Sequence, residues 1–234
     1  MIELLRGNGP LLRIGHRGAA ALATENTLRS LEVAIEHGVD LVEFDIARLR
    51  DGTLVLAHSR REAGARPATL DETLALLAAN GVGAHLDLKC SGSEPAVVEA
   101  LRRHGVLERT IVSSFSARTL RVLHALEPAL RLGFTYPRDL SGLGRHRVLA
   151  PAAAGVSAAL RSTLPARILG LLRRAGASAA VLHHRVVSPA VVDRCHAHGA
   201  AVLVWTVNDP ELARRLDDFG VDAVITDDPR IFGG

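Results

Sequence analysis

The chain has 234 residues, of which 48% are hydrophobic and 23% charged, a balance typical of a globular protein and not of a disordered chain. The formal net charge is only +3 and aromatic residues make up 3%, so the basic, aromatic-rich surface of a nucleic-acid-binding protein is not expected. The length suits one barrel of alternating strands and helices, for which about 250 residues is usual.

Neither a secretion signal nor a membrane span is expected from the sequence. Residues 1–18 have no apolar signal core, and no window approaches the roughly 18 apolar residues of a membrane span. Cys90 and Cys195 have neither metal-binding nor redox spacing, so both are expected to be free thiols. We therefore expect a cytoplasmic protein without stable membrane insertion and without a nucleic-acid partner, and the oligomeric state is left open.

Short apolar runs alternate with amphipathic stretches along the chain. The apolar runs predict eight strands, at residues 11–16, 40–47, 83–89, 110–115, 131–136, 179–184, 200–207 and 221–227. The stretches between them predict helices, at residues 25–38, 70–81, 93–105, 116–128, 167–176, 188–199 and 209–220. Such alternation implies parallel strands joined by helical crossovers. Eight units favour a closed (β/α)8 TIM barrel, and an open doubly wound sheet is the alternative.

Two connections differ from the regular pattern. Residues 138–166, after the fifth strand, exceed a usual loop and predict an irregular, partly helical excursion over the barrel mouth. The connection after the second strand, which begins at His58, is short. No linker or repeat marks a boundary, so residues 1–234 are expected to form a single domain.

Charged residues interrupt two predicted strands where a barrel enzyme would carry its active site, at the strands' carboxyl ends. Glu43 and Asp45 are two residues apart, so their side chains leave the strand on the same face, and Asp87 and Lys89 have the same spacing. If both faces point into the barrel, three carboxylates and one ammonium group meet in a small volume. Unpaired carboxylates buried together would repel one another or become protonated.

A divalent cation would relieve this repulsion. Three oxygen donors with no histidine or thiol among them favour Mg²⁺ or Ca²⁺ over zinc. The first strand also lacks the H-x-H pattern expected of zinc or nickel hydrolases built on a barrel. The alternative is structural, with Glu43 and Asp45 paired to arginines of neighbouring strands.

Two of the eleven histidines fall where catalysis would need them. His16 ends the first predicted strand, and His58 follows the short run TLVLAH. Two imidazoles beside a bound cation suit acid and base catalysis at neutral pH. His183 and His184 end the sixth strand, where a structural role is at least as plausible.

These residues lie in motifs that resemble one known family. The runs HRGAAALATENT at 16–27 and VDLVEFDIARLRDGTLVLAH at 39–58 are similar to the glycerophosphodiester phosphodiesterase family. HLDLK at 85–89, SSFS at 113–116 and the runs VLVWTVND and VDAVITDDP also resemble strand ends of that family. The resemblance extends over nearly the whole chain.

The resemblance implies roles for the matching residues. His16 matches the general base and His58 the general acid. Glu43 and Asp45 match two ligands of the cation. Asp87 falls where most members have a glutamate ligand, and a carboxylate one methylene shorter can still bind a cation directly or through water.

Three further positions match substrate contacts. Arg17 matches an arginine that contacts the phosphate, Lys89 the lysine beside the third ligand, and Trp205 an aromatic residue that flanks the substrate. Lys89 is the only lysine of the chain, so the other 27 of its 28 basic residues are arginine. A compact ammonium fits between a cation and a phosphoryl oxygen where a broad guanidinium does not.

The activity implied is the hydrolysis of a small-molecule glycerophosphodiester to glycerol 3-phosphate and an alcohol, with one Mg²⁺ or Ca²⁺. Ser59 replaces the family's aspartate after His58, and the connection that follows is short, so the site is expected either to be more open or to be roofed by residues 137–165 instead. Asp87 with Lys89 also resembles relatives of the sphingomyelinase and lysophospholipase D types, so lysophospholipids are alternative substrates. A barrel that binds phosphodiesters without turnover is a further alternative. The assignment of acid and base and the presence of a cyclic intermediate stay open.

Overall fold

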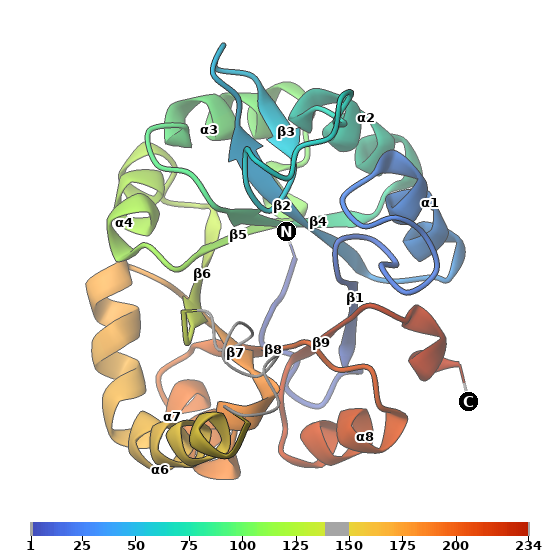
Figure 1. The fold of residues 1–234 in the computed structure, drawn as a ribbon. Helices are drawn as coiled ribbons and strands as arrows, with labels where there is room; N and C mark the ends of the chain where they lie inside the picture. Colours follow the sequence, from blue (N-terminus) through green and yellow to red (C-terminus); the bar gives the residue numbers. More distant parts are fainter. Residues whose placement is uncertain (1, 139–149, 234) are drawn as a thin grey trace.

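The computed structural model describes residues 2–138 and 150–233, which form a closed barrel surrounded by helices (Figure 1). β1 pairs in parallel with both β9 and β2, and this second pairing closes the sheet. The predicted TIM barrel is therefore confirmed. The eight barrel strands are β1 (Leu12–Gly15), β2 (Leu41–Arg48), β4 (Gly83–Leu88), β5 (Thr110–Ser114), β6 (Arg131–Tyr136), β7 (Ala179–His183), β8 (Ala201–Trp205) and β9 (Ala223–Thr226).

A short ninth strand, β3 (Leu54–Leu56), is absent from the predicted set. It pairs antiparallel with the end of β2, with Leu56 opposite Ile46. The backbone N–H of Ala57 then donates to the carbonyl of Asp45 at 3.1 Å. This hairpin brings the chain back to the end of β2 immediately before His58.

Helices cover the outside of the barrel, as the amphipathic pattern predicts (Figure 1). The described α-helices are α1 (Leu28–Glu36), α2 (Leu70–Asn80), α3 (Glu94–Arg103), α4 (Ala117–Leu126), α6 (Ala150–Ala175), α7 (Pro189–His196) and α8 (Pro210–Asp218), and the short 3₁₀ helices are η1 (Leu107–Arg109), η2 (His184–Val186) and η3 (Pro229–Phe232). Local signals fix several starts. Thr69 and Glu72 form a capping box at α2, and the Asp209 side chain caps α8 ahead of Pro210.

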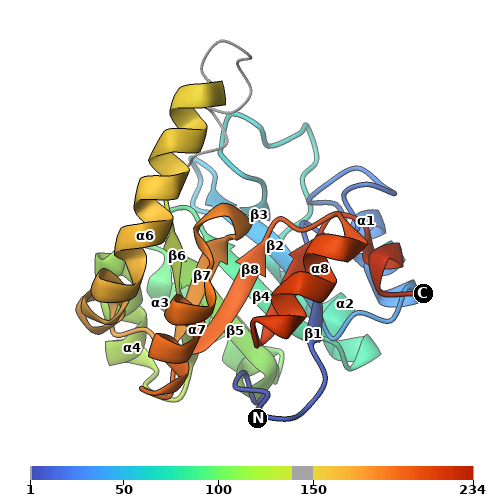
Figure 2. The ribbon, with the colours of Figure 1, turned by 90° about the horizontal axis from the view of Figure 1, so that it is seen from below.

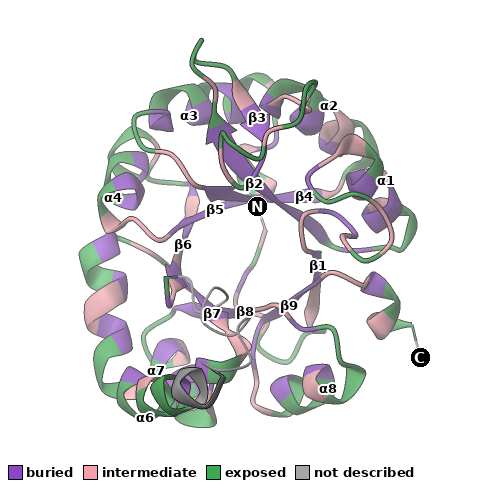
Figure 3. Ribbon diagram, in the orientation of Figure 1, coloured by how far each residue is buried: buried purple, intermediate pink, exposed green. Residues whose placement is uncertain are grey.

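Apolar side chains fill both the space between sheet and helices and the lower barrel. Most strand residues are buried, whereas each helix buries mainly the face that meets the sheet (Figure 3). Inside the barrel, Ile14, Leu41, Ile111 and Leu203 belong to one apolar cluster, which Leu4 of the N-terminal segment joins. The acidic residues Glu43, Asp45 and Asp87 face the upper part of the barrel, whereas Arg131, opposite Ile111 in the register, lies at the lower end of β6.

The segment predicted as an excursion over the mouth is largely helical where it is described. Residues 150–166 form the first part of α6, which therefore begins well before the predicted start at residue 167. Residues 139–149 lie outside the described residues. The lower part of α6 packs against the barrel through Leu164 and Ile168, while its first turns rise past the strand ends (Figure 2). No helix within residues 2–138 and 150–233 is long and apolar enough to cross a membrane.

A buried carboxylate ties the N-terminal segment to the lower barrel. Asp222 is fully buried and accepts hydrogen bonds from the backbone N–H groups of Arg6 (3.0 Å) and Val202 (2.7 Å). Its other contact is with Nε2 of His196, at 2.8 Å. The N-terminal segment, α7 and β8 thus share one carboxylate.

We expect Asp222→Ala to lower the free energy of unfolding by about 2–4 kcal/mol, because it leaves buried donors without an acceptor. Chemical denaturation measures this change. Asp217→Ala is the matched control, since Asp217 also contacts Arg6, at 2.6 Å, but in an exposed pair whose loss should cost less than about 1 kcal/mol. Equal losses in the two variants would contradict the assigned role of Asp222.

Candidate active site

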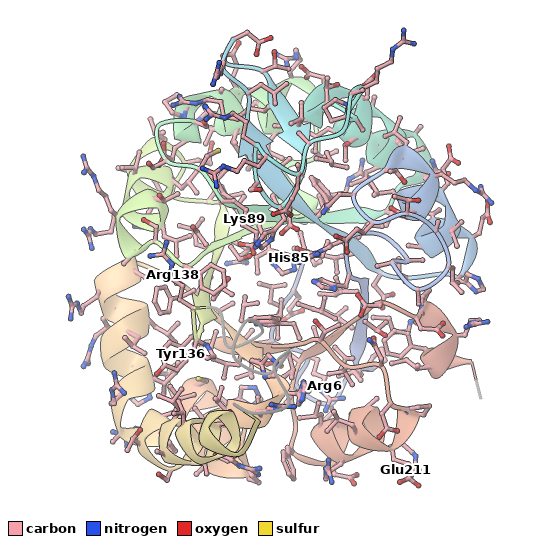
Figure 4. The ribbon with its side chains drawn as sticks, viewed as in Figure 1. Arg6, His85, Lys89, Tyr136, Arg138 and Glu211 are labelled. Carbon is pink, nitrogen blue, oxygen red and sulfur yellow. The ribbon has the colours of Figure 1, made fainter. Side chains whose placement is uncertain are left out.

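A cavity of about 320 Å³ opens at the carboxyl ends of the barrel strands. His85 of β4 and Lys89, which directly follows β4, lie together inside the barrel, whereas Arg138 lies nearer the helices (Figure 4). All eight residues predicted for the site line this one cavity: His16, Arg17, Glu43, Asp45, His58, Asp87, Lys89 and Trp205.

The three carboxylates converge as their spacing on the strands predicts. Asp45 of β2 lies opposite Asp87 of β4 in the parallel register, and Glu43 is two residues earlier on β2. One oxygen of each carboxylate lies within 4.8 Å of the others. Ligand oxygens lie about 2.0–2.6 Å from Mg²⁺ or Ca²⁺, so two oxygens bound to one ion are at most about 4–5 Å apart. The spacing and the all-oxygen donor set therefore fit one hard divalent cation.

The protein's own groups do not neutralise this cluster evenly. Glu43 is 4% exposed, and burial raises its pKa to about 7 against the opposing charge of His16. The neighbouring carboxylates Asp45 and Asp87 raise it further. A cation at this position would stabilise the ionised form of Glu43.

Asp45 is the most heavily paired of the three. It is contacted by Lys89 Nζ at 2.9 Å, Arg17 Nε at 3.1 Å and His58 Nδ1 at 3.4 Å. The Asn26 amide donates to it at 3.1 Å and accepts from its backbone N–H at 3.0 Å. Burial opposes ionisation of Asp45, but these partners outweigh it and hold its pKa well below the usual range. An ion pair with an arginine, which was the structural alternative considered from the sequence, thus occurs at Asp45. The arginine is Arg17, in the loop after β1.

Lys89 bridges two of the carboxylates. Its ammonium group donates to Asp87 as well as to Asp45 and lies 5.3 Å from the ring centroid of Phe115. Burial disfavours the charged form, but the charges of Asp87 and Asp45 outweigh it and raise the pKa of Lys89. The only lysine of the chain therefore stays charged in a space bounded by two carboxylates and an aromatic ring.

The loop after β1 holds Arg17 against Glu43. The Arg17 backbone has φ +50°, and its N–H donates to Glu43 Oε2 at 2.8 Å. At Gly18, with φ +84°, a Cβ would lie about 2.4 Å from the Ser30 backbone, so only glycine permits this approach. The Arg17 guanidinium also contacts Glu25 at 2.9 Å. Arg17 and Gly18 of the His-Arg-Gly run therefore meet two different structural requirements.

His16 has a partner that sequence reasoning missed. Its Nδ1 lies 2.6 Å from Asp227 Oδ1, and its Nε2 lies 3.9 Å from Glu43. Asp227 is in turn fixed by Asn208, whose amide donates to it at 2.6 Å. Burial disfavours protonation of His16, but Glu43 and Asp227 outweigh it and raise its pKa. Asp227 follows β9, so the rule that polar residues at strand ends belong to the site identifies it.

His58 occupies a more open position than His16. Its side chain is 43% exposed, compared with 16% for His16. The contact with Asp45, including a hydrogen bond, raises the pKa of His58 despite partial burial. One imidazole is thus enclosed beside Glu43, and the other faces the solvent side of the carboxylate cluster.

Trp205 forms part of an aromatic wall. Its ring meets Phe115 edge to face at 6.5 Å and His183 at 5.1 Å, and its indole N–H donates to the Val181 carbonyl at 3.3 Å. His183 does not line the cavity but packs behind Trp205. Nδ1 of His184 lies 2.9 Å from the carbonyl of Thr206. Both histidines therefore support the aromatic wall, and a structural role fits them better than a role in lining the mouth of the barrel.

Four other polar residues of the cavity were not singled out from the sequence. His85, Ser113 and Thr135 come from β4, β5 and β6, and Arg138 follows β6. The first three share the inward face of their strands, but a lone histidine, serine or threonine in an apolar run gives no chemical signal. Arg138 lies at the start of the segment whose form the sequence does not fix.

The short connection after His58 folds into a compact turn. Ser59 donates through its hydroxyl to Glu62 at 2.9 Å, and its carbonyl accepts from the backbone N–H groups of Glu62 and Ala63. No residue between Ser59 and Ala68 lines the cavity. The replacement of the family's aspartate by serine therefore leaves this side of the mouth without an added side chain.

We predict that His183 stays neutral until about pH 4, because burial and the nearby charges of His184 and Arg185 lower its pKa to about 4. Since the folded-state pKa lies below the ordinary value, this group lowers stability as pH falls from about 6.5 toward 4. Trp205 is the only tryptophan, so its fluorescence reports protonation of the adjacent ring. Quenching should have a midpoint near pH 4 and be absent in His183→Gln. A midpoint near 6.5 would contradict this, with circular dichroism monitoring the fold.

Comparisons with known proteins agree on one family. Residues 16–80 and 84–231 match the Glycerophosphoryl diester phosphodiesterase family. The chain is 26% identical over 254 residues to a glycerophosphodiester phosphodiesterase of Caldanaerobacter subterraneus subsp. tengcongensis, covering 93% of this chain and 94% of that protein. It is 28% identical over 261 residues to probable glycerophosphodiester phosphodiesterase 2 of Mycobacterium tuberculosis, covering 97% and 90%.

Solved structures give the same result. An Oleispira antarctica phosphodiesterase, in complex with the product sn-glycerol-3-phosphate, matches with a TM-score of 0.77 and 25% identity over 95% of both chains. The resemblance carried by the motifs around His16, Glu43 and His58 is thereby confirmed. The chain belongs to the glycerophosphoryl diester phosphodiesterase family and is a phosphoric diester hydrolase.

Proposed function

We propose that this protein hydrolyses glycerophosphodiesters to glycerol 3-phosphate and an alcohol, with two histidines as acid and base and one bound divalent cation. The observation that carries the proposal is the union in one cavity of His16, His58 and the carboxylates Glu43, Asp45 and Asp87. The Oleispira antarctica phosphodiesterase carries sn-glycerol-3-phosphate as its product, which supports the same product here.

Glu43, Asp45 and Asp87 would hold the cation. Their oxygen donors suit Mg²⁺ or Ca²⁺, which supplies charge that stabilises the phosphoryl oxygens during displacement. The side chain of Asp87 is shorter than glutamate, but its convergence with the other two carboxylates supports a role as ligand.

His16 is suited to the base. With Nδ1 held against Asp227, its Nε2 faces the carboxylate side of the cavity and is free to take a proton from the attacking water or substrate hydroxyl. Asp227 stabilises the imidazolium that results, as the third member of a triad does. His16 Nε2 is therefore the atom at which we place the proton.

His58 is suited to the acid. Its contact with Asp45 favours the protonated ring, and its greater exposure places it where an alcohol of variable size can leave toward solvent. Transfer of a proton to the departing oxygen avoids release of an alkoxide. Arg17 and Lys89 would add fixed positive charge beside the phosphoryl oxygens.

The primary test is hydrolysis of glycerophosphocholine and of a lysophospholipid by the purified protein, with Mg²⁺, Ca²⁺ or a chelator. Release of glycerol 3-phosphate that needs the cation and is lost in His16→Ala supports the proposal. Turnover of the lysophospholipid alone would assign the protein to the lysophospholipase D type. Binding of both compounds without turnover would indicate a non-catalytic barrel.

A second prediction concerns the cation alone. Isothermal titration of the metal-free protein with Mg²⁺ and Ca²⁺ should give one site, weakened at least about tenfold in Asp87→Asn because a ligand charge is lost. Asp218→Asn, on the exposed end of α8, is the control and should bind as the wild type does. Unchanged affinity in Asp87→Asn would remove Asp87 from the proposed ligand set.

A third prediction concerns the compactness of Lys89. We expect Lys89→Arg to lose about 10²–10³-fold in kcat/KM, nearly as much as Lys89→Ala, because the planar guanidinium does not fit the space between Asp45 and Asp87. Arg214→Lys on α8 is the matched exchange at an exposed position and should be neutral. If Lys89→Arg retained half of the wild-type kcat/KM, charge alone would explain the lysine.

A further inference from the structure

Each carboxylate of the cluster accepts a hydrogen bond from a neutral group. These donors are the backbone N–H of Arg17 at Glu43, the amide of Asn26 at Asp45 and the hydroxyl of Ser113 at Asp87. A backbone N–H and a planar amide direct their hydrogens rigidly, whereas a hydroxyl hydrogen rotates about its C–O bond to suit any acceptor. The hold on Asp87 therefore depends on what fixes the Ser113 hydroxyl.

The strand register brings His85, Asp87 and Ser113 together. β4 and β5 are parallel, and Asp87 lies opposite Ser113. His85 precedes Asp87 by two residues, so both side chains leave β4 on the same face. All three residues line the active-site cavity, and all three are buried. The Ser113 hydroxyl is thus in a position to contact both side chains of β4.

His85 fixes the direction of the Ser113 hydroxyl. The hydroxyl donates to Asp87 Oδ1 at 3.2 Å, because an ionised carboxylate can only accept. The serine oxygen, 2.9 Å from His85 Nε2, must therefore accept from that nitrogen. Nε2 then carries a hydrogen in the neutral ring and in the charged ring alike. The donors form a relay from His85 through Ser113 to Asp87, in which each hydrogen bond polarises the next.

The relay holds the side of Asp87 that Lys89 does not. The Lys89 ammonium group donates to Oδ2 and the Ser113 hydroxyl to Oδ1. Lys89 also contacts Asp45 at 2.9 Å, so without Ser113 it would draw the Asp87 carboxylate toward Asp45. Donors on both oxygens fix the plane of the carboxylate. The side chain of Asp87 is one methylene shorter than glutamate and has less freedom to correct a misplaced carboxylate.

The ring of His85 is kept at a cost to the stability of the fold. Its Nδ1 has no hydrogen-bond partner among the described residues, although the residue is only 1% exposed. Ile111, opposite His85 in the register, belongs to the apolar cluster of the lower barrel. An apolar side chain in place of His85 would therefore avoid an unpaired polar atom. The contact of Nε2 with Ser113 explains a histidine at this position better than packing does.

We propose that Ser113 and His85 are positioning residues that set the Asp87 carboxylate for cation binding, Ser113 directly and His85 through Ser113. This inference rests on the proposed function, in which Asp87 is a ligand of the cation. Neither residue needs to touch the cation or the reacting atoms. Their effect is therefore expected first in cation affinity and only then in turnover.

Calorimetric titration of the metal-free protein with Mg²⁺ and Ca²⁺ tests the direct step. We expect Ser113→Ala to weaken cation affinity about 10–100-fold, as the loss of a hydrogen bond to a metal ligand does. Ser114→Ala is the matched control, because this neighbouring buried hydroxyl donates instead to the Leu88 carbonyl at 2.8 Å. Its cation affinity should equal that of the wild type. Unchanged affinity in Ser113→Ala, or equal losses in the two variants, would overturn the inference.

Variants of His85 test the indirect step. We expect His85→Leu to weaken cation affinity about 3–10-fold while its midpoint of chemical denaturation stays at or above that of the wild type. A purely structural role would lower the midpoint and leave cation affinity unchanged, which would overturn the inference. His85→Gln retains a donor near the Nε2 position and should restore wild-type affinity.

A double variant tests whether His85 acts through Ser113. His85→Leu combined with Ser113→Ala should bind the cation no more weakly than Ser113→Ala alone, since the relay is already broken. Additive losses would overturn the relay.

The hydrogen on Nε2 can be observed in the wild type without any cation. Long-range ¹H–¹⁵N correlation spectra, with the His85 signals assigned by their loss in His85→Gln, should show a protonated Nε2 and an unprotonated Nδ1. A ring protonated on Nδ1 alone would overturn the relay. This measurement remains decisive if His85→Leu does not fold.

The outcomes separate this inference from the proposed function. Cation affinity that falls in Ser113→Ala but not in Ser114→Ala, in a protein that hydrolyses no glycerophosphodiester, would retain the positioning role and overturn the proposed function. Cation-dependent hydrolysis of glycerophosphocholine, with cation affinity unchanged in Ser113→Ala, would retain the proposed function and overturn the positioning role.

Discussion

Mutual repulsion among three carboxylates is the constraint around which the active site is arranged. Glu43, Asp45 and Asp87 are on adjacent parallel strands and almost fully buried, so they cannot all be ionised without nearby positive charge. Arg17 and Lys89 supply part of this positive charge. Arg17 pairs with Asp45, and Lys89 pairs with Asp45 and Asp87. Glu43, which lacks an arginine or lysine partner of its own among the described side chains, is the group that a bound cation would affect most.

The barrel separates stability from chemistry along its axis. Its lower half is filled by apolar side chains and tied together by Asp222, which joins the N-terminal segment, α7 and β8. Its upper half carries the carboxylate cluster with Arg17 and Lys89. Because no residue of the carboxylate cluster is needed to fill the lower core, substitutions at the mouth can alter activity while the packed barrel remains intact.

The sequence predicts the barrel well because the information is local. Alternating apolar runs define the strands, and two-residue spacing places Glu43 with Asp45 and Asp87 with Lys89 on the inward face. Asp227 can be identified by its position after β9, but its pairing with His16 depends on barrel closure. His85 is harder to identify from the sequence, since its contact with Ser113 arises only from the strand register. The early start of α6 is not predicted, because its alanine-rich first half has helix propensity but little amphipathic pattern. Cellular location remains a prediction from the sequence.

The bond between Glu43 and the backbone of Arg17 has a thermodynamic consequence. The same carboxylate belongs to the proposed cation site and accepts from the N–H of a residue held at φ +50°. Any ligand that shifts Glu43 therefore shifts the loop that aims the guanidinium, and an anion bound by that guanidinium shifts Glu43 in return. Linkage requires the two effects to be equal in free energy. Cation and phosphodiester are thus expected to bind this protein as cooperative partners, each altering the affinity for the other by the same factor.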